Sequence, residues 1–240
     1  MAPDVKAMPD PLPIVLIPGL TCSARLYADQ IPALWRFGPV TVADHTRDDS
    51  MVAIARRILA AAPPRFALAG LSMGGYIAFE IMRQAPERVV KLALLDTGAR
   101  AEAPAQTERR KVVIALAKSG RCAEVPDIAF PIYVHPNRHN DQALKQIVRM
   151  MAAETGVEAF LRQQQAIIGR PDSRPGLTGI KCPTLVLVGD GDEATPPELA
   201  REIAGAIGGA RLAVIPECGH LSTLEQPDSV TAALIDWMSW

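Results

Sequence analysis

The stretch Arg65-Phe-Ala-Leu-Ala-Gly-Leu-Ser-Met-Gly-Gly-Tyr-Ile-Ala-Phe-Glu80 decides the fold of this chain. Its apolar run from Phe66 to Ala69 predicts a buried strand, and the spacing of apolar residues from Met73 to Gln84 predicts a helix. Ser72 then occupies the turn between them. A strand that turns into a helix within a few residues strains the backbone at the apex and lifts the apical side chain clear of the sheet. This is a suitable position for a nucleophile.

Small residues flank Ser72 on both sides. Gly70 lies two positions before it and Gly74 two positions after it, which gives the pattern G-x-S-x-G, and Gly75 is a further small residue. These glycines let the helix pass close to the strand it has just left. The backbone N–H of Met73 is expected to face the same space and to stabilise a developing oxyanion. The alternative is a glycine-rich turn in which the serine only caps a helix.

Short apolar strands alternate with helices on both sides of this stretch. Further strands are predicted at 14–17, 40–43, 89–95, 184–188 and 211–215, and further helices at 25–34, 51–62, 197–207 and 223–240. All-apolar strands that alternate with helices indicate a parallel α/β sheet with right-handed crossovers.

Between residues 99 and 177 the pattern changes, because apolar residues recur at helical spacing and no strand is evident. Helices are predicted at 112–117, 143–153 and 157–168, with a loop at 131–140. We therefore expect a helical cap at 99–177, inserted into an α/β core made of 1–98 and 178–240. The cap holds 12 Lys and Arg against 8 Asp and Glu, and the remainder 13 against 18. This basic cap favours anionic substrates, unless its charges only cover solvated helix faces.

The composition points to a small-molecule partner. The 240 residues are 49% hydrophobic and 21% charged with a net charge of −1, so no basic surface for nucleic acid or membranes is indicated. The proline-rich residues 1–13 resemble neither a signal nor a transit peptide, and no apolar run approaches membrane-spanning length. We expect a cytoplasmic protein without membrane insertion. Its four cysteines form no C-x-x-C pair, which favours reduced thiols over disulfides or zinc. The oligomeric state is not indicated.

A serine hydroxyl becomes a good nucleophile when a neighbouring base removes its proton and a third group orients that base. Of the four histidines, His220 lies directly after the last predicted strand, at the carboxyl edge where parallel sheets form their sites. Asp192 follows the preceding strand. The chain order Ser72, Asp192, His220 is the order associated with the nucleophile elbow. Asp190 and Asp96 are alternative acids, although Asp190 is better placed to brace its own turn.

The other histidines and two cysteines have plainer interpretations. His45 follows a predicted strand and could line the site, but a solvated loop histidine is the simpler reading. His135 and His139 are four residues apart, yet Pro136 breaks the helix that would align them for a metal. Cys22 and Cys218 flank the predicted site in sequence and are expected to be small buried residues.

With these motifs the chain resembles the α/β-hydrolase-fold proteins over nearly all of its core, with little that is specific in the cap. The resemblance implies Ser72 as nucleophile, Asp192 as acid and His220 as base. Glu225-Gln226-Pro227 also fits the usual start of the closing helix. Family members commonly place a second oxyanion donor after His-Gly; here Pro18-Gly19 stands instead, which implies the backbone N–H of Leu20. The short N-terminal segment leaves little room for the antiparallel pair that often opens this fold, so we expect about six strands.

The resemblance implies a serine hydrolase that cleaves a small carboxylic ester through an acyl-enzyme and needs no cofactor or metal. Hydrolysis of enol-lactones, thioesters or carbon–carbon bonds is the alternative chemistry, since one triad serves several leaving groups. Cofactor-independent peroxidase or oxygenase chemistry is a further alternative. A ligand-binding receptor that retains the triad is the hypothesis from another class.

Overall fold

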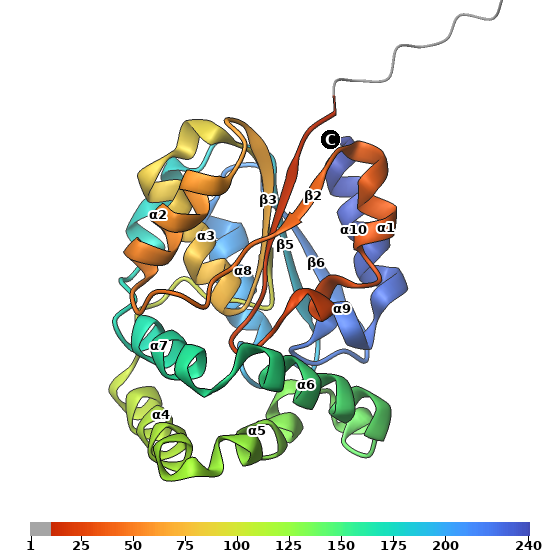
Figure 1. The fold of residues 1–240 in the computed structure, drawn as a ribbon. Helices are drawn as coiled ribbons and strands as arrows, with labels where there is room; N and C mark the ends of the chain where they lie inside the picture. The colour runs from red at the N-terminus through yellow and green to blue at the C-terminus, as the bar shows by residue number, and fades with distance from the viewer. Residues whose placement is uncertain (1–10) are drawn as a thin grey trace, which may run out of the picture.

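One six-stranded sheet, parallel throughout, organises the polypeptide (Figure 1). The computed structural model describes residues 11–240, so most of the N-terminal segment considered above lies outside the described residues. The strand order is β2-β1-β3-β4-β5-β6. The strands are β1 (Ile14–Ile17), β2 (Val40–Val42), β3 (Phe66–Leu71), β4 (Val89–Leu95), β5 (Thr184–Gly189) and β6 (Arg211–Ile215). The predicted parallel α/β sheet of about six strands is confirmed.

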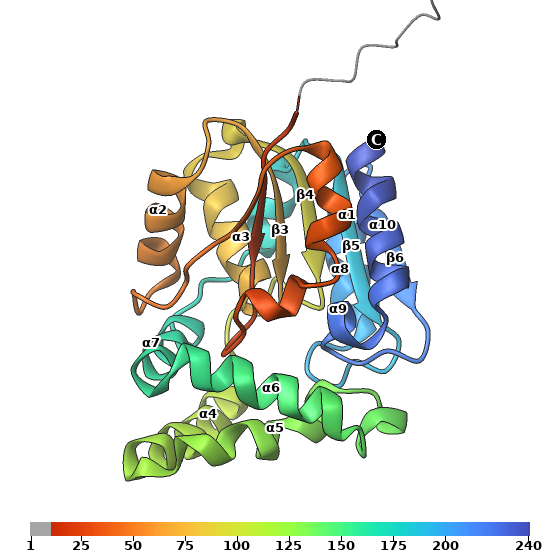
Figure 2. The same cartoon turned by 45° about the vertical axis from the view of Figure 1, so that its right-hand side comes forward.

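Helices cover both faces of the sheet. On one face lie α2 (Met51–Ala61), α3 (Met73–Gln84) and α8 (Pro197–Ala206); on the other lie α1 (Ile31–Leu34) and α10 (Pro227–Ser239) (Figures 1 and 2). Successive strand residues point to opposite faces, so each strand contributes to two separate cores. In β1, Val15 and Ile17 join the first core while Ile14 and Leu16 join the second.

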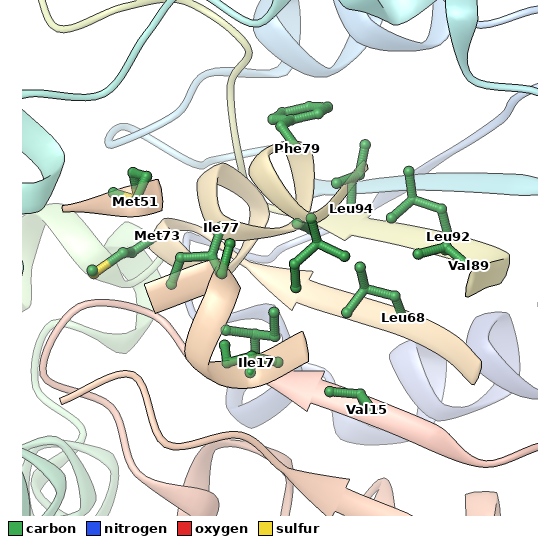
Figure 3. Close-up of a cluster of buried hydrophobic side chains, with 14 of the residues drawn as sticks. Val15, Ile17, Met51, Leu68, Met73, Ile77, Phe79, Val89, Leu92 and Leu94 are labelled. Carbon is green, nitrogen blue, oxygen red and sulfur yellow. The ribbon is translucent and has the colours of Figure 1, made fainter. Parts of the chain in front are cut away.

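The first core is built where α2 and α3 meet the middle strands. Figure 3 shows Ile17 of β1 and Leu68 of β3 in one cluster with Met73 and Ile77 of α3, and all four are fully buried. Each such side chain stabilises the fold by about 1.5–3 kcal/mol relative to leaving it exposed. The buried strands and the helix that begins at Met73 therefore form one rigid support for Ser72.

The segment between β4 and β5 carries four helices, which we call the cap helices: α4 (Pro104–Leu116), α5 (Val125–Tyr133), α6 (Gln142–Thr155) and α7 (Val157–Ile168). They lie across the end of the sheet where the strands terminate (Figures 1 and 2). The division into a core of 1–98 and 178–240 and a cap of 99–177 stays our proposal.

One cap helix does not follow from the sequence pattern. We expected a loop to start at residue 131, but α5 continues to Tyr133 with Pro126 in its first turn and Pro131 near its end. A proline in the first turn removes an N–H that has no helical partner, and one in the last turn disturbs few remaining hydrogen bonds. The two prolines therefore bound this short helix rather than prevent it.

Two predicted helices are interrupted. The helix expected at 25–34 is a 3-10 turn at Ala24–Tyr27 followed by α1, and the closing helix is split into α9 (Ser222–Glu225) and α10 at Pro227. Because the helix is broken at Pro227, α9 is a separate short helix, and it directly follows the loop that carries His220. Within residues 11–240 no helix combines the length and apolarity needed to cross a bilayer.

Candidate active site

Ser72 sits at the tip of the turn from β3 to α3, in a strained backbone conformation. Its φ of 56° and ψ of −113° are rare for a residue with a side chain. Its N–H donates to the Leu95 carbonyl of β4 at 2.9 Å, which ties the tip to the sheet. A Cβ at Gly70 would overlap the Gly74 carbonyl, and one at Gly74 would overlap the Ile17 carbonyl. The close approach of α3 to β3 and β1 that the glycines at 70 and 74 predicted is therefore present.

His220 lies on the loop after β6 and reaches Ser72. Its Nε2 is 2.8 Å from Ser72 Oγ, and the ring is buried with 4% of its surface exposed. The backbone N–H groups of His220 and Leu221 both donate to the Tyr133 carbonyl at the end of α5, each at 3.1 Å. The loop that carries the histidine is thus held by a cap helix as well as by the core.

Asp192 lies on the loop after β5 and contacts the other side of the imidazole. Its Oδ2 is 2.8 Å from His220 Nδ1 and accepts from Thr195 Oγ1 at 2.7 Å. Its Oδ1 accepts from the backbone N–H groups of Ala194 and Thr195 at 2.9 and 2.8 Å. A carboxylate at Nδ1 keeps the proton on that nitrogen, so Nε2 presents its lone pair to Ser72.

The electrostatics of His220 follow from this pairing. Burial opposes protonation of the ring, but the nearby Asp192 charge and its hydrogen bond outweigh burial and raise the pKa of His220 above its ordinary value of 6.5. The raised pKa makes the imidazole a stronger base toward the Ser72 hydroxyl.

The two alternative acids have other partners. Asp190 is exposed and accepts from the Cys218 backbone N–H at 3.2 Å, so it braces its turn as expected. Asp96 is fully buried and accepts from the Gly189 N–H at 3.1 Å and from the Ser222 hydroxyl. Burial, with repulsion from Asp192, raises the pKa of Asp96 well above its ordinary value. The carboxylate in contact with His220 is that of Asp192.

The two expected oxyanion donors lie beside the serine. Met73 is the first residue of α3, and Leu20 follows the end of β1 and lines the same pocket as Ser72. Within the described part of the chain, neither backbone N–H donates to another protein group. Thr21, the next residue, has a φ of 56°, and its N–H donates to Gln163 Oε1 of α7 at 3.1 Å. A cap helix therefore also holds the loop that carries Leu20.

His45 is not the solvated loop residue that we expected from the sequence. It is 2% exposed, and its Nε2 is 2.9 Å from the Gly19 carbonyl oxygen. A carbonyl accepts, so Nε2 carries a proton and donates it, and burial lowers the pKa of His45, which keeps the ring neutral. The Gly19 carbonyl and the Leu20 N–H belong to one peptide unit, so His45 fixes the plane of the expected donor. The signal in the sequence is its position at the end of β2, beside β1.

Glu225 links the His220 loop to the cap. Its buried carboxylate accepts from the Gly219 and Leu221 N–H groups at 3.1 and 3.2 Å through Oε1, and from the His135 N–H at 2.8 Å through Oε2. Sequence reasoning noted this glutamate only as part of the closing-helix start. The sequence signal that could have revealed this role is the spacing of five residues between His220 and Glu225, because one turn of helix can bring the Glu225 side chain back to the His220 loop.

The cysteines and the remaining histidines offer no second centre. Burial raises the pKa of Cys22 to about 12 and also raises the pKa of Cys218, so both remain neutral thiols, which are poor nucleophiles. His135 Nδ1 accepts from the Asn137 N–H at 3.3 Å in an exposed turn. Among residues 11–240, no group of three His, Cys, Asp or Glu side chains is placed to hold a metal ion.

The hollow against Ser72 and His220 is small, at about 20 Å³. The rest of its wall comes from the loop of Leu20, from Leu71 and Leu221 of the core, and from cap residues that include Tyr133 and Val148. The Tyr133 ring is tilted by 32° against the His220 ring, with centroids 5.4 Å apart. Loops at the sheet edge thus supply Ser72, Asp192 and His220, while the cap helices limit the space in front of them.

Comparisons with known proteins identify the family to which this fold belongs. A family model described as "Alpha/beta hydrolase family" matches residues 14–234. The chain is 27% identical over 178 residues to a 2-hydroxy-6-oxononadienedioate/2-hydroxy-6-oxononatrienedioate hydrolase of Klebsiella pneumoniae. That match covers 72% of this chain but only 62% of that protein.

Two solved structures superpose over nearly the whole chain. A thermophilic esterase from Thermogutta terrifontis, with malate bound, is 28% identical with a TM-score of 0.86 and covers 95% of this chain and 89% of that one. The enol-lactonase from Burkholderia xenovorans LB400 is 25% identical with a TM-score of 0.87, over 97% and 93% of the two chains. With the family model spanning the sheet, the elbow and the cap helices, the chain belongs to the α/β hydrolase family.

Proposed function

We propose that this protein is a serine hydrolase that cleaves a small carboxylic ester through an acyl-enzyme. One observation carries the proposal: Ser72 Oγ, the His220 ring and Asp192 Oδ2 form a continuous hydrogen-bonded chain with both links at 2.8 Å. The strained backbone of Ser72 supports the same proposal, because such strain persists where a side chain has to be presented in one orientation.

In the first half-reaction, Ser72 Oγ forms a bond to the ester carbonyl carbon while His220 Nε2 takes the hydroxyl proton. Asp192 orients the ring and stabilises the imidazolium, and the N–H groups of Leu20 and Met73 stabilise the negative oxygen. The carbon–oxygen bond to the alcohol then breaks, and the alcohol leaves with the proton from His220. In the second half-reaction, water gives a proton to His220 and attacks the acyl carbon. The bond from that carbon to Ser72 Oγ then breaks, His220 returns the proton to Oγ, and the acid leaves.

Relatives support hydrolysis but differ in the bond they cleave. An esterase and an enol-lactonase have similar folds, and a hydrolase of an oxo-diacid is similar in sequence. Lactone hydrolysis is our second candidate, since a lactone is an internal ester and requires the same groups. A screen across esters, lactones and thioesters of graded acyl length would rank these substrates by kcat/KM.

Replacement of the nucleophile tests the proposal. Ser72→Ala should lower kcat for a short p-nitrophenyl ester by about 10⁴-fold or more, because the base then has no hydroxyl to activate. The matched control is Ser119→Ala in an exposed part of the cap, which should retain wild-type activity. Full activity in Ser72→Ala would refute the proposed nucleophile.

A fluorophosphonate probe separates an enzyme from a receptor. The enzyme proposal requires covalent labelling of Ser72 and steady-state turnover of an ester. Labelling accompanied by only a single turnover would favour a ligand-binding receptor that retains the triad.

A further inference from the structure

A second, larger hollow adjoins the pocket at Ser72. It has a volume of about 250 Å³ and shares four lining residues with that pocket, namely Leu20, Thr21, Tyr133 and Val148. Most of its wall is apolar and comes from α4, α5 and α7. A substrate whose carbonyl lies at Ser72 would therefore extend into this hollow.

The polar groups of the hollow are mainly on α4 and α7. Gln106, Arg109 and Arg110 come from α4, and Gln164 comes from α7. One acidic residue, Glu193, also lines the wall and is exposed to solvent. An apolar hollow with a few placed polar groups is the usual form of a small-molecule site.

Arg110 is held firmly in place. Its Nε donates to Glu102 Oε1 at 2.6 Å and its Nη1 donates to Gln164 Oε1 at 3.0 Å, while 21% of its side chain stays exposed. No acceptor for its Nη2 occurs within the part of the chain that the structure describes. A fixed guanidinium loses little conformational freedom when it binds a ligand, and its planar donors match a carboxylate.

The charges around Arg110 do not balance. Glu102 is almost fully buried and is also paired with Arg170, whose side chain is 6% exposed and lies over the Tyr76 ring. Two guanidinium groups thus surround one carboxylate, and Arg170 is almost fully buried and does not line this hollow. The excess of one positive charge is presented by Arg110 at the wall of the hollow.

Several other cap cations are neutralised on the surface. Arg121 pairs with Glu124 at 2.6 Å, Arg149 pairs with Asp127 at 2.7 Å, and the side chains involved are largely exposed. These pairs fit solvated helix faces, which was the plainer interpretation of the basic cap. Arg110 differs because it is partly buried and faces a hollow beside the serine.

We infer that Arg110 binds a carboxylate group of the substrate, so that the substrate is a carboxylate-bearing ester or lactone. The inference rests on the proposed serine hydrolase function. A single negative charge matches the single excess positive charge of the cluster, which favours a carboxylate over a doubly charged phosphate. Arg109, exposed on the same helix, adds attraction at the rim.

Esters with and without a terminal carboxylate test the inference. One series consists of monomethyl esters of linear dicarboxylic acids from succinate to pimelate, and a second consists of acetyl esters of ω-hydroxy acids. Each compound is compared with its uncharged counterpart, in which a methyl group replaces the carboxylate. We expect the acid to exceed the neutral ester in kcat/KM by about tenfold or more at one chain length, a difference that shrinks as salt rises.

Arg110→Gln should abolish this preference mainly through KM, whereas Arg121→Gln removes the same charge from the cap and should preserve it. Arg170 still neutralises Glu102 in Arg110→Gln, so folding should persist, and thermal unfolding verifies this. If Arg110→Gln fails to fold, the wild-type protein provides the test instead. Butyrate should then inhibit its hydrolysis of a neutral ester more strongly than butanamide does.

Equal rates for acids and neutral esters at every length would overturn the inference, as would equal inhibition by butyrate and butanamide or equal effects of the two substitutions. Absence of hydrolysis of any ester, charged or neutral, would instead refute the proposed function.

Discussion

At the scale of single residues, the hydrogen bonds of His220 decide which ring nitrogen faces Ser72. Asp192 occupies Nδ1 and leaves Nε2 facing Ser72. The carboxylate itself is fixed by two backbone N–H groups, so it cannot rotate without losing them. Because Asp192 and His220 are both buried, water does not weaken their interaction.

Asp192→Asn should lower kcat by about 10⁴-fold, because the amide no longer stabilises the correct tautomer and the imidazolium. The matched control is Asp96→Asn, which should stay within about tenfold of wild type, since Asp96 bonds to Ser222 and Gly189 rather than to His220. Steady-state kinetics on a p-nitrophenyl ester measures both. A large loss in the control alone would make Asp96 the catalytic acid.

The pH dependence of activity should follow the protonation of His220. Burial lowers its pKa, but Asp192 raises it more, so the folded-state pKa lies above 6.5. Only the neutral ring accepts the serine proton, and activity is therefore lost as the pH falls through that pKa. The acidic limb of kcat/KM should have its midpoint above pH 6.5, as measured from pH 5 to 9. A midpoint below pH 6 would contradict this assignment.

His45 should act as a positioning residue for the oxyanion-binding peptide. In His45→Leu the Gly19 carbonyl loses its donor, and kcat should fall by about 10- to 100-fold with little change in KM, because full loss of an oxyanion donor costs about 10²–10³. His45→Gln retains a donor at a similar distance and should recover much of the rate. Equal kcat values in both variants would show that His45 has only a packing role.

At the scale of elements, the close approach of α3 to β1 and β3 places Ser72 above the sheet. α3 begins directly at Met73, and Gly74 lies against the Ile17 carbonyl of β1. A helix so close to the sheet leaves no room for a side chain at this position. The glycines of the elbow are therefore required by packing as well as by the turn.

Gly74→Ala should destabilise the protein by about 1–3 kcal/mol or more, because its methyl group would overlap backbone atoms that cannot move freely. Gly205→Ala is the matched control. Gly205 lies inside α8 with nothing within 4 Å of an added Cβ, so the substitution should stabilise by roughly 0.4–1 kcal/mol. Urea unfolding measures both changes. Similar values for the two variants would show that the elbow relaxes more easily than its packing indicates.

At the scale of the whole molecule, the loops that carry His220 and Leu20 lie between the sheet and the cap helices, and both hold them in place. Tyr133 of α5 accepts from the His220 loop, and Gln163 of α7 accepts from the loop that carries Leu20. Glu225 adds a third link between the end of α5 and the core. The position of the cap and the geometry of the site are therefore coupled.

Glu225 offers a test of this coupling. Glu225→Ala leaves the N–H groups of His135 and Gly219 without an acceptor, while the Leu221 N–H keeps only the Tyr133 carbonyl, and the change should destabilise by about 2 kcal/mol or more. It should also lower kcat, because the His220 loop loosens. Ser229→Ala, at an exposed position of α10, should change stability by less than about 0.5 kcal/mol. Hydrogen exchange at residues 133–139 measures the loosening, and unchanged exchange in Glu225→Ala would exclude the link.

Much of the core could be predicted from the sequence because its signals are local. β1, β4, β6 and α3 begin and end at the predicted residues, since apolar runs, helical spacing and glycine positions act over a few neighbours. Their positions directly after predicted strands placed Ser72, Asp192 and His220 on loops at one edge of a parallel sheet. Their catalytic roles stay a prediction, whereas their proximity is a finding.

The sequence by itself determined the α/β sheet, the elbow and the residues that meet there, because each depends on short-range patterns and on the common edge of parallel strands. Only the tertiary structure decided the path of α5, the burial of His45 and the hollow that Arg110 faces. These features depend on how helices distant in sequence pack together, and amphipathic periodicity does not specify which faces meet. The reaction is therefore indicated by local sequence, and the substrate by the packing of the cap helices.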